Sequence, residues 1–173
     1  MITVVLSTSI RADRARVWRA LTDPAEVVGW DAAIVAPLDA PPDYPKPGQH
    51  VRWRYRMGKI PLVLHDCPKE VVVGERLRSS IALGPLRFDE TYTLAPDPKD
   101  SACSLLSMRL SASNVVPLVG GILDRIAVTR LTTRLADTTL RSLRRWCELT
   151  RVSQPRHSPS RWRAIGRDPH RGY

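Results

Sequence analysis

Residues 9–24 read SIRADRARVWRALTDP, a stretch that decides the fold because it joins one strand to two helices. The residues from Thr3 to Ile10 are rich in β-branched side chains and predict a short first strand. Asp13 is placed to cap a helix, and Asp23 before Pro24 repeats the same start signal. A second, brief helix is therefore expected to end near Trp30. The apolar residues of the first helix share one side: Val17, Trp18 and Leu21.

Downstream of these helices the pattern changes to strands. Residues 39–48 contain four prolines, which exclude regular structure and predict an exposed loop. The segment from Val51 to Ser111 is then punctuated by short turn signals, which favour an antiparallel meander. Pro68 predicts a bend or a bulge within its strand. The turn signals are Gly58-Lys59, Gly74-Glu75, Gly84-Pro85 and residues 96–100.

Alternation within the strands predicts one buried and one solvated face. Trp53 and Tyr55 alternate with Arg52, Arg54 and Arg56, so the arginines are expected on the outer face. A helix is predicted from roughly Val116 to Thr150, with these residues on its apolar side: Ile122, Ile126, Leu131, Leu135, Leu140, Leu143 and Trp146. A curved sheet packed on one long helix tends to leave a cavity between them.

Together, residues 9–24, the tryptophan that ends the second helix and the stretch FDETYTL at 88–94 resemble the SRPBCC superfamily. This is the START-like or Bet v 1-like group of helix-grip folds, which includes polyketide cyclase/dehydrase and lipid-transport proteins. The resemblance covers about residues 2–150. It implies an α+β fold in which a seven-stranded antiparallel sheet wraps around a long C-terminal helix, with two short helices between the first two strands. It implies no particular reaction, because such a fold hosts many functions.

Composition narrows the domain organisation and the compartment. The 173 residues suffice for one domain, predicted over 1–150, followed by a basic, disordered tail over 151–173. Cys67, Cys103 and Cys147 show no CxxC spacing, and no apolar run reaches the ~20 residues of a membrane span. We therefore predict a reduced, cytoplasmic protein. Half of the net charge of +10 falls in the tail, which is either a solvated segment or a weak contact for anionic membrane or nucleic acid.

The candidate site residues are those expected to face the helix. A buried, unpaired carboxylate costs on the order of 1–3 kcal/mol, so Glu90 either pairs with Arg78 or Arg109 or faces a wet cavity. There, Glu90 and Tyr92 would orient a polar group of a ligand or act as acid and base. The predicted ligand-binding residues are Trp53, Tyr55, Leu64, Phe88, Glu90, Tyr92, Met108, Ile122 and Ile126.

A second catalytic candidate is His65. It precedes Asp66, and because consecutive strand residues point to opposite faces, only one of the two can reach the cavity. The scattered histidines predict no metal site. The chain lacks a phosphate loop and a dinucleotide fingerprint, so no cofactor is expected.

The leading hypothesis is a carrier or sensor that binds a small hydrophobic ligand, such as a lipid, an isoprenoid quinone or a polyketide. The loop from Pro41 to Pro47 and the segment from Val116 to Ile122 are the candidate entrances. The alternative is a cyclase, aromatase or dehydratase that acts on polyketide-like substrates in the same cavity. A third hypothesis is an adaptor that works through the tail.

Overall fold

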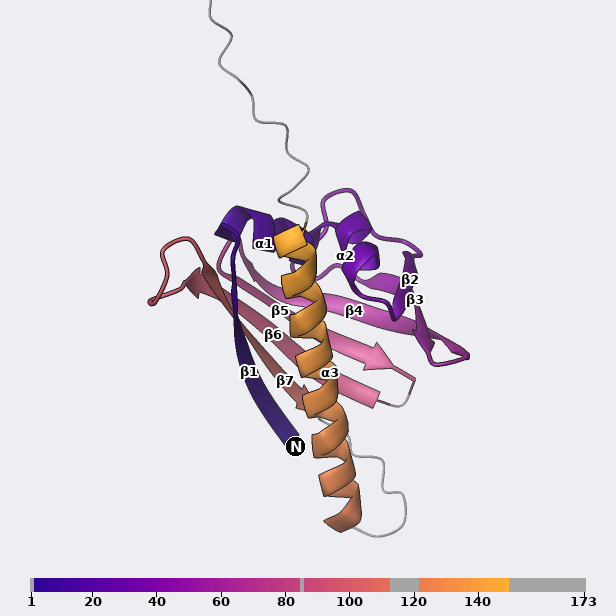
Figure 1. The fold of residues 1–173 in the computed structure, drawn as a ribbon. Helices are drawn as coiled ribbons and strands as arrows, with labels where there is room; N and C mark the ends of the chain where they lie inside the picture. Colours follow the sequence, from indigo (N-terminus) through magenta and orange to yellow (C-terminus); the bar gives the residue numbers. More distant parts are fainter. Residues whose placement is uncertain (1, 85, 113–121, 150–173) are drawn as a thin grey trace, which may run out of the picture.

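The computed structural model describes residues 2–84, 86–112 and 122–149, without the side chains of 122–128. Ten elements follow one another along these residues (Figure 1). They are β1 (Ile2–Ile10), α1 (Arg14–Thr22), α2 (Pro24–Trp30), β2 (Ile34–Pro37), β3 (Val51–Met57), β4 (Ile60–Val72), β5 (Arg76–Leu83), β6 (Leu86–Pro96), β7 (Ser104–Ala112) and α3 (Ile122–Leu149).

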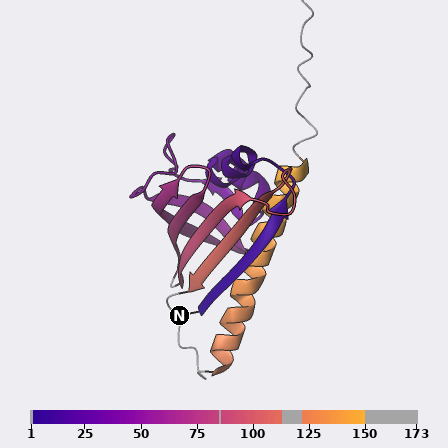
Figure 2. The ribbon, with the colours of Figure 1, turned by 90° about the vertical axis from the view of Figure 1, so that its left-hand side faces the viewer.

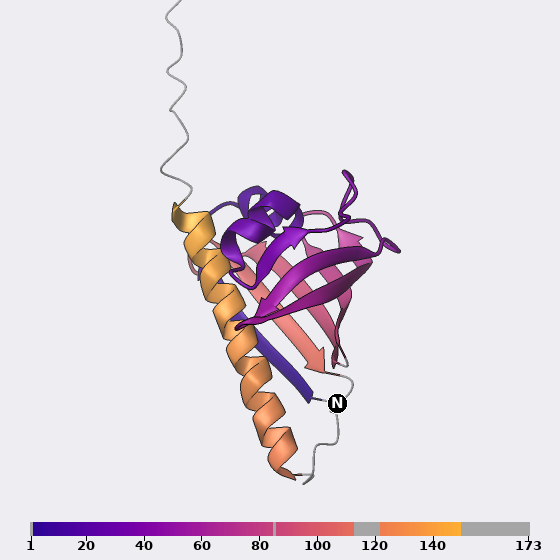
Figure 3. The ribbon, with the colours of Figure 1, turned by 90° about the vertical axis from the view of Figure 1, so that its right-hand side faces the viewer.

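The strands form one antiparallel sheet in the order β1-β7-β6-β5-β4-β3-β2. Short turns connect the strands from β3 to β7, as the turn signals predicted, while β1 returns to pair with β7. The pairing of β4 with β5 shifts between Pro68 and Glu70, which confirms the predicted irregularity at this proline. The sheet curves strongly, and Figures 2 and 3 show α3 lying along the β1 side of its concave face. The predicted seven-stranded helix-grip architecture is therefore confirmed.

Two short helices cover one end of the concave face. Asp13 begins α1 by accepting a hydrogen bond from the Arg16 backbone N–H at 2.7 Å. Asp23 begins α2 in the same way, accepting from the Ala25 N–H at 2.9 Å. The indole N–H of Trp30, at the end of α2, donates to the carbonyl of Ala20 in α1 at 2.8 Å. This buried bond fixes the angle between the two helices.

The buried side of α3 differs in part from the predicted one. Its buried residues recur at helical spacing and face β1, β7, α1 and α2. Leu131 was predicted to be part of this side, but it is 48% exposed because it precedes the buried Thr132 and therefore points about one quarter turn away from the core. Of the predicted helix, residues 116–121 and Thr150 lie outside the described residues. The buried residues of α3 are Thr132, Ala136, Leu140, Leu143 and Cys147.

The short strand β2 was not identified from its residues. It contains only the four residues Ile34–Pro37 and lies next to the proline-rich loop, so its own sequence carries little strand signal. It is formed by pairing with β3, across a register shift between Ile34 and Ala36. None of the described helices combines the length and the apolarity that a membrane crossing requires.

Candidate ligand-binding cavity

The register of the sheet points one row of side chains toward α3. Trp53 of β3 lies opposite Leu64 of β4. Ser79 of β5 lies opposite Glu90 of β6, and Glu90 in turn lies opposite Leu110 of β7. Directly opposite residues of antiparallel strands share a face of the sheet. These side chains therefore meet on the concave face although they come from five strands.

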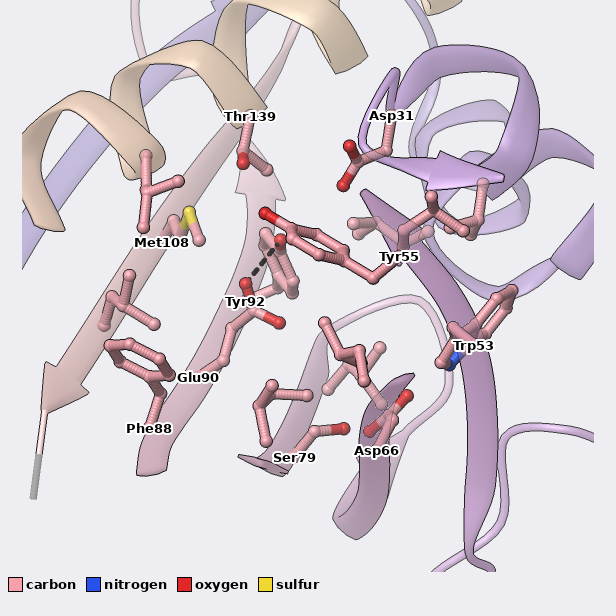
Figure 4. A pocket seen from close by; sticks show the side chains of 18 of the residues that line it. Asp31, Trp53, Tyr55, Asp66, Ser79, Phe88, Glu90, Tyr92, Met108 and Thr139 are labelled. Atoms are coloured by element: carbon pink, nitrogen blue, oxygen red, sulfur yellow. Dashed lines mark hydrogen bonds between the residues drawn. The ribbon is translucent and has the colours of Figure 1, made fainter. Parts of the chain in front are cut away.

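Together with residues from α1, α2, the proline-rich loop and α3, they line a partly open space of about 150 Å³, here named the central cavity (Figure 4). Its apolar lining residues are Leu21, Val27, Trp30, Ile34, Trp53, Leu64, Leu77, Ile81, Leu83, Phe88, Met108, Leu110 and Leu135. Its polar lining residues are Asp31, Tyr44, Tyr55, Asp66, Ser79, Glu90, Tyr92 and Thr139.

Most of the predicted ligand-binding residues lie on this cavity: Trp53, Tyr55, Leu64, Phe88, Glu90, Tyr92 and Met108. Ile122 and Ile126 belong to α3, but their side chains lie outside the described residues. That the lining residues bind a ligand stays a prediction.

The structure does not bring His65 to Glu90. His65 is exposed and lies opposite Arg52 on the outer face of the sheet. The next residue, Asp66, is buried and lines the central cavity. The sequence left open which of the two residues reaches the cavity. Because side chains alternate between faces along β4, it is Asp66.

Glu90 has a phenol as its partner. Tyr92 Oη donates a hydrogen bond to Glu90 Oε1 at 2.8 Å, which is possible because residues two apart on β6 share a face (Figure 4). The two arginines considered as partners, Arg78 and Arg109, both lie opposite Thr91 and therefore on the outer face. Of the two alternatives for Glu90, an ion pair with one of these arginines is therefore wrong, and the carboxyl faces the cavity.

Burial changes the proton affinity of this pair. It raises the pKa of Glu90 to about 7, although the hydrogen bond from Tyr92 opposes the shift, and the charges of Asp66 and Asp31 raise the pKa further. Burial and the neighbouring Glu90 hold the pKa of Tyr92 well above its ordinary value. Near neutral pH the carboxyl therefore exchanges its proton with the medium while the phenol stays protonated.

Asp66 forms a second polar pair on the cavity wall. Tyr44 Oη donates to Asp66 Oδ2 at 2.7 Å, and the Tyr44 ring packs edge-on against Trp53 with centroids 5.9 Å apart. The other carboxylate oxygen, Oδ1, is buried and accepts no hydrogen bond of normal geometry from the described residues. Burial raises the pKa of Asp66, and the neighbouring donors Tyr44, Ser79 and Trp53 partly offset that rise.

Asp31 supplies a third carboxyl from the end of α2. Its Oδ1 accepts a hydrogen bond from the Ala33 N–H at 2.9 Å, and burial raises its pKa. Tyr55 extends from β3 into the same space, as Figure 4 shows. Burial and the Asp31 charge raise the pKa of Tyr55. Among the described residues, no group of three His, Cys, Asp or Glu side chains is arranged to hold a metal ion.

The sequence did not single out Asp31, Tyr44 or Thr139. The proline-rich loop was predicted to be exposed, yet Tyr44 turns its ring inward onto Trp53. A single aromatic residue among prolines and aspartates was the available signal, since such a side chain rarely remains solvated. Asp31 directly follows the tryptophan that ends α2, and Thr139 lies on α3 between buried residues, positions that only the packing of the helices makes informative.

Comparisons with known proteins bear on the fold. No protein-family model matches this chain, and no curated protein matches it. Among solved structures, protein MLL2253 from Mesorhizobium loti is 22% identical with a TM-score of 0.65, over 86% of this chain and 98% of that chain. A START superfamily protein from Mycobacterium smegmatis is 13% identical with a TM-score of 0.61, over 83% and 97% of the two chains.

A further similar structure is DynU16, a protein of the dynemicin biosynthetic locus, at 20% identity and a TM-score of 0.56. The match covers 82% of this chain and 46% of that chain. These similarities define the chain as a protein of the START-like helix-grip fold. The predicted resemblance to the SRPBCC superfamily is thereby confirmed at the level of the fold.

Proposed function

We propose that this protein binds a small hydrophobic molecule in the central cavity between the sheet and α3. The observation that carries the proposal is the composition of the cavity wall, which is largely aliphatic and aromatic with a few polar groups from separate elements. Pockets for small ligands have this composition. Burial of apolar surface supplies roughly 25 cal/mol per Å², and Glu90, Tyr92 and Tyr55 fix the orientation of the ligand's polar group.

The volume of the cavity limits the size of the ligand. An apolar cavity of roughly 150 Å³ holds a molecule the size of benzene, and the central cavity is of this size, about 150 Å³. We therefore favour a ligand with a single ring over an extended lipid or an isoprenoid quinone. A larger guest would have to extend out of this space or displace lining side chains such as Tyr44.

Native mass spectrometry of the freshly purified protein, followed by solvent extraction, tests for a bound molecule. A titration with benzyl alcohol followed by NMR then tests for saturable binding. Thr139 points into the cavity from α3, so Thr139→Phe is expected to fill the cavity and abolish binding. The adjacent Thr138 is exposed, so Thr138→Phe is the matched control and is expected to bind normally.

Two results would contradict the proposal. One is the absence of both a co-purified molecule and saturable binding in a folded protein. The other is equal binding by the Thr139→Phe and Thr138→Phe variants, which would place the binding site elsewhere.

A second candidate is an enzyme of the cyclase, aromatase or dehydratase type that uses the same cavity. The observation that favours it is the Glu90–Tyr92 pair, because a carboxyl with a pKa of about 7 is suited to general acid–base catalysis near neutral pH. Incubation with a polyketide-like substrate separates the candidates. The enzyme predicts turnover that Glu90→Gln abolishes while binding remains, whereas the binder predicts that the substrate is recovered unchanged.

A further inference from the structure

We propose that the ligand of the central cavity is a small amine with a one-ring apolar body, bound as its cation, and that the cavity rejects carboxylates. This inference rests on the proposed binding function and adds the charge of the ligand to it.

The charges that line the cavity have one sign. Three carboxyls face the same space from different elements: Asp31 after α2, Asp66 on β4 and Glu90 on β6. The described lining residues include no lysine, arginine or histidine. The arginines of this part of the sheet, such as Arg54 and Arg78, are exposed on the outer face. Since the sheet lies between those arginines and the carboxyls, they do not form ion pairs with the cavity.

The carboxyls also keep free acceptor capacity. Asp66 is only 6% exposed, and its Oδ1 accepts no hydrogen bond of normal geometry from the described chain. Glu90 uses Oε1 for Tyr92, and within the described residues its Oε2 receives no hydrogen bond. A buried acceptor without a donor, such as Asp66 Oδ1, is destabilising. An ammonium group carries up to three donors and no acceptor, which is the complement of this wall.

The aromatic part of the wall favours the same ligand. Trp53, Tyr44, Tyr55, Phe88 and Tyr92 all line the cavity, around the carboxyls. The faces of such rings attract cations as well as apolar groups, and the attraction is stronger in a desolvated site. An apolar amine can therefore bury its ring while its charge meets both aromatic faces and carboxylate oxygens.

The same wall disfavours a ligand that carries a carboxylate. Its charge would add to the three acidic groups without a cation to offset them. It would also bring acceptors to a wall where two of the three tyrosine hydroxyls already donate, since Tyr92 donates to Glu90 and Tyr44 donates to Asp66. The cavity is thus expected to discriminate against fatty and aromatic acids.

Amine binding is expected to depend on pH through Glu90. The titratable groups that face Glu90 are Asp31, Tyr44 from the proline-rich loop, Tyr55 of β3, Asp66 of β4 and Tyr92 of β6. In the described part of the chain, β5, β7 and α3 present to the cavity only groups that do not titrate. The pKa of Glu90 is about 7, so the carboxylate form that attracts an amine gains population as the pH rises through neutrality.

The experiment compares three one-ring probes of matched size: benzylamine, benzyl alcohol and benzoate. Their dissociation constants are measured by NMR titration at about pH 8, where a carboxyl with a pKa near neutrality is mostly ionised. We expect benzylamine to bind about tenfold or more tighter than benzyl alcohol, with benzoate the weakest. Benzylamine affinity is also expected to fall as the pH is lowered to about 6, while benzyl alcohol affinity stays nearly constant.

Glu90→Gln keeps the shape of the side chain and removes its charge. This variant is expected to lose most of the preference for benzylamine over benzyl alcohol. The matched control is Asp89→Asn, which removes one negative charge from the same strand on the outer face, where Asp89 lies opposite Ser111. The control is expected to keep the full preference.

The outcomes separate the two proposals. If benzyl alcohol or benzoate binds as tightly as benzylamine, the charge assignment is overturned while the binding function stands. A benzylamine preference that survives in the double variant Glu90→Gln, Asp66→Asn also overturns it. If none of the three probes binds a folded protein, both proposals fail.

Discussion

At the scale of single residues, Glu90 links the pH to the stability of the fold. Its pKa lies at about 7 in the folded protein against an ordinary value of 4.5, because the carboxyl is buried. A raised carboxyl pKa adds stability that is fully present below about pH 4.5 and is lost as the pH rises through about 7. Between these values the folded protein therefore becomes less stable relative to a variant that cannot ionise at this position.

Glu90→Gln is accordingly expected to have a stability close to that of the parent chain at about pH 4 and to exceed it by about 3 kcal/mol at about pH 8. The measurement is urea unfolding at several pH values, with Asp89→Asn on the outer face of the same strand as the matched control. A constant difference between Glu90→Gln and the parent chain across the pH range would show that Glu90 is not the titrating group.

At the scale of elements, α2 and α3 meet through a glycine and a tryptophan. A Cβ atom added at Gly29 would lie 2.5 Å from a ring carbon of Trp146. The indole cannot move away freely, because its N–H donates to Glu26 Oε2 at 2.9 Å and Glu26 is paired with Arg19 at 2.7 Å. Because Glu26 of α2 holds the Trp146 ring in this place, only glycine fits at position 29.

Gly29→Ala is therefore expected to destabilise the protein by about 1–3 kcal/mol. The sign of the change in stability is informative, because a glycine-to-alanine change in an unobstructed helix would stabilise that helix by up to about 1 kcal/mol. Chemical denaturation of Gly29→Ala, Trp146→Ala and the double variant measures the coupling between the two positions. In the Trp146→Ala background the alanine should be neutral or stabilising. A loss of the same size in both backgrounds would exclude the steric explanation.

The position of α3 on the sheet supports a second prediction at this scale. Leu143 is fully buried, whereas Leu131 on the same helix is 48% exposed. Leu143→Ala should cost about 2–5 kcal/mol because it leaves a cavity in the core, and Leu131→Ala should change the stability by less than about 1 kcal/mol. Thermal and urea unfolding of both variants tests this assignment of faces. Equal losses of stability in the two variants would contradict this assignment of the buried and exposed faces of α3.

At the scale of the whole molecule, the described residues that line the central cavity fall between Leu21 and Thr139. Removal of residues 151–173, which hold six arginines and one aspartate, is therefore expected to leave benzyl alcohol binding unchanged within about twofold. NMR titration of the truncated and the full chain tests this. Vesicles containing anionic lipid, added to both chains, test the predicted membrane contact of the tail independently. Loss of cavity binding on truncation would contradict a site formed by the sheet and α3.

The whole fold can also be compared with what the sequence predicted. The helix caps at Asp13 and Asp23, the turn signals and the strand alternation are local properties, so they predicted α1, α2 and the strands from β3 to β7 correctly. The inward side chains of β3 and β6 followed from the same alternation. Strand β2 was missed because its pairing with β3, and not its own four residues, makes it a strand.

By itself, the sequence determined the order of the elements other than β2 and the alternation of faces along each strand, because both follow from spacing along the chain. Only the tertiary structure decided which polar groups meet. Asp31, Tyr44 and Asp66 come from a helix end, a loop and a strand, and their convergence with Glu90 depends on the curvature of the sheet and on how the loop folds back. The partner of Glu90 was also decided there: the register places Arg78 and Arg109 on the outer face and leaves Tyr92 as its donor. The pKa of Glu90 and the single sign of charge in the cavity follow from that convergence, which no local pattern encodes.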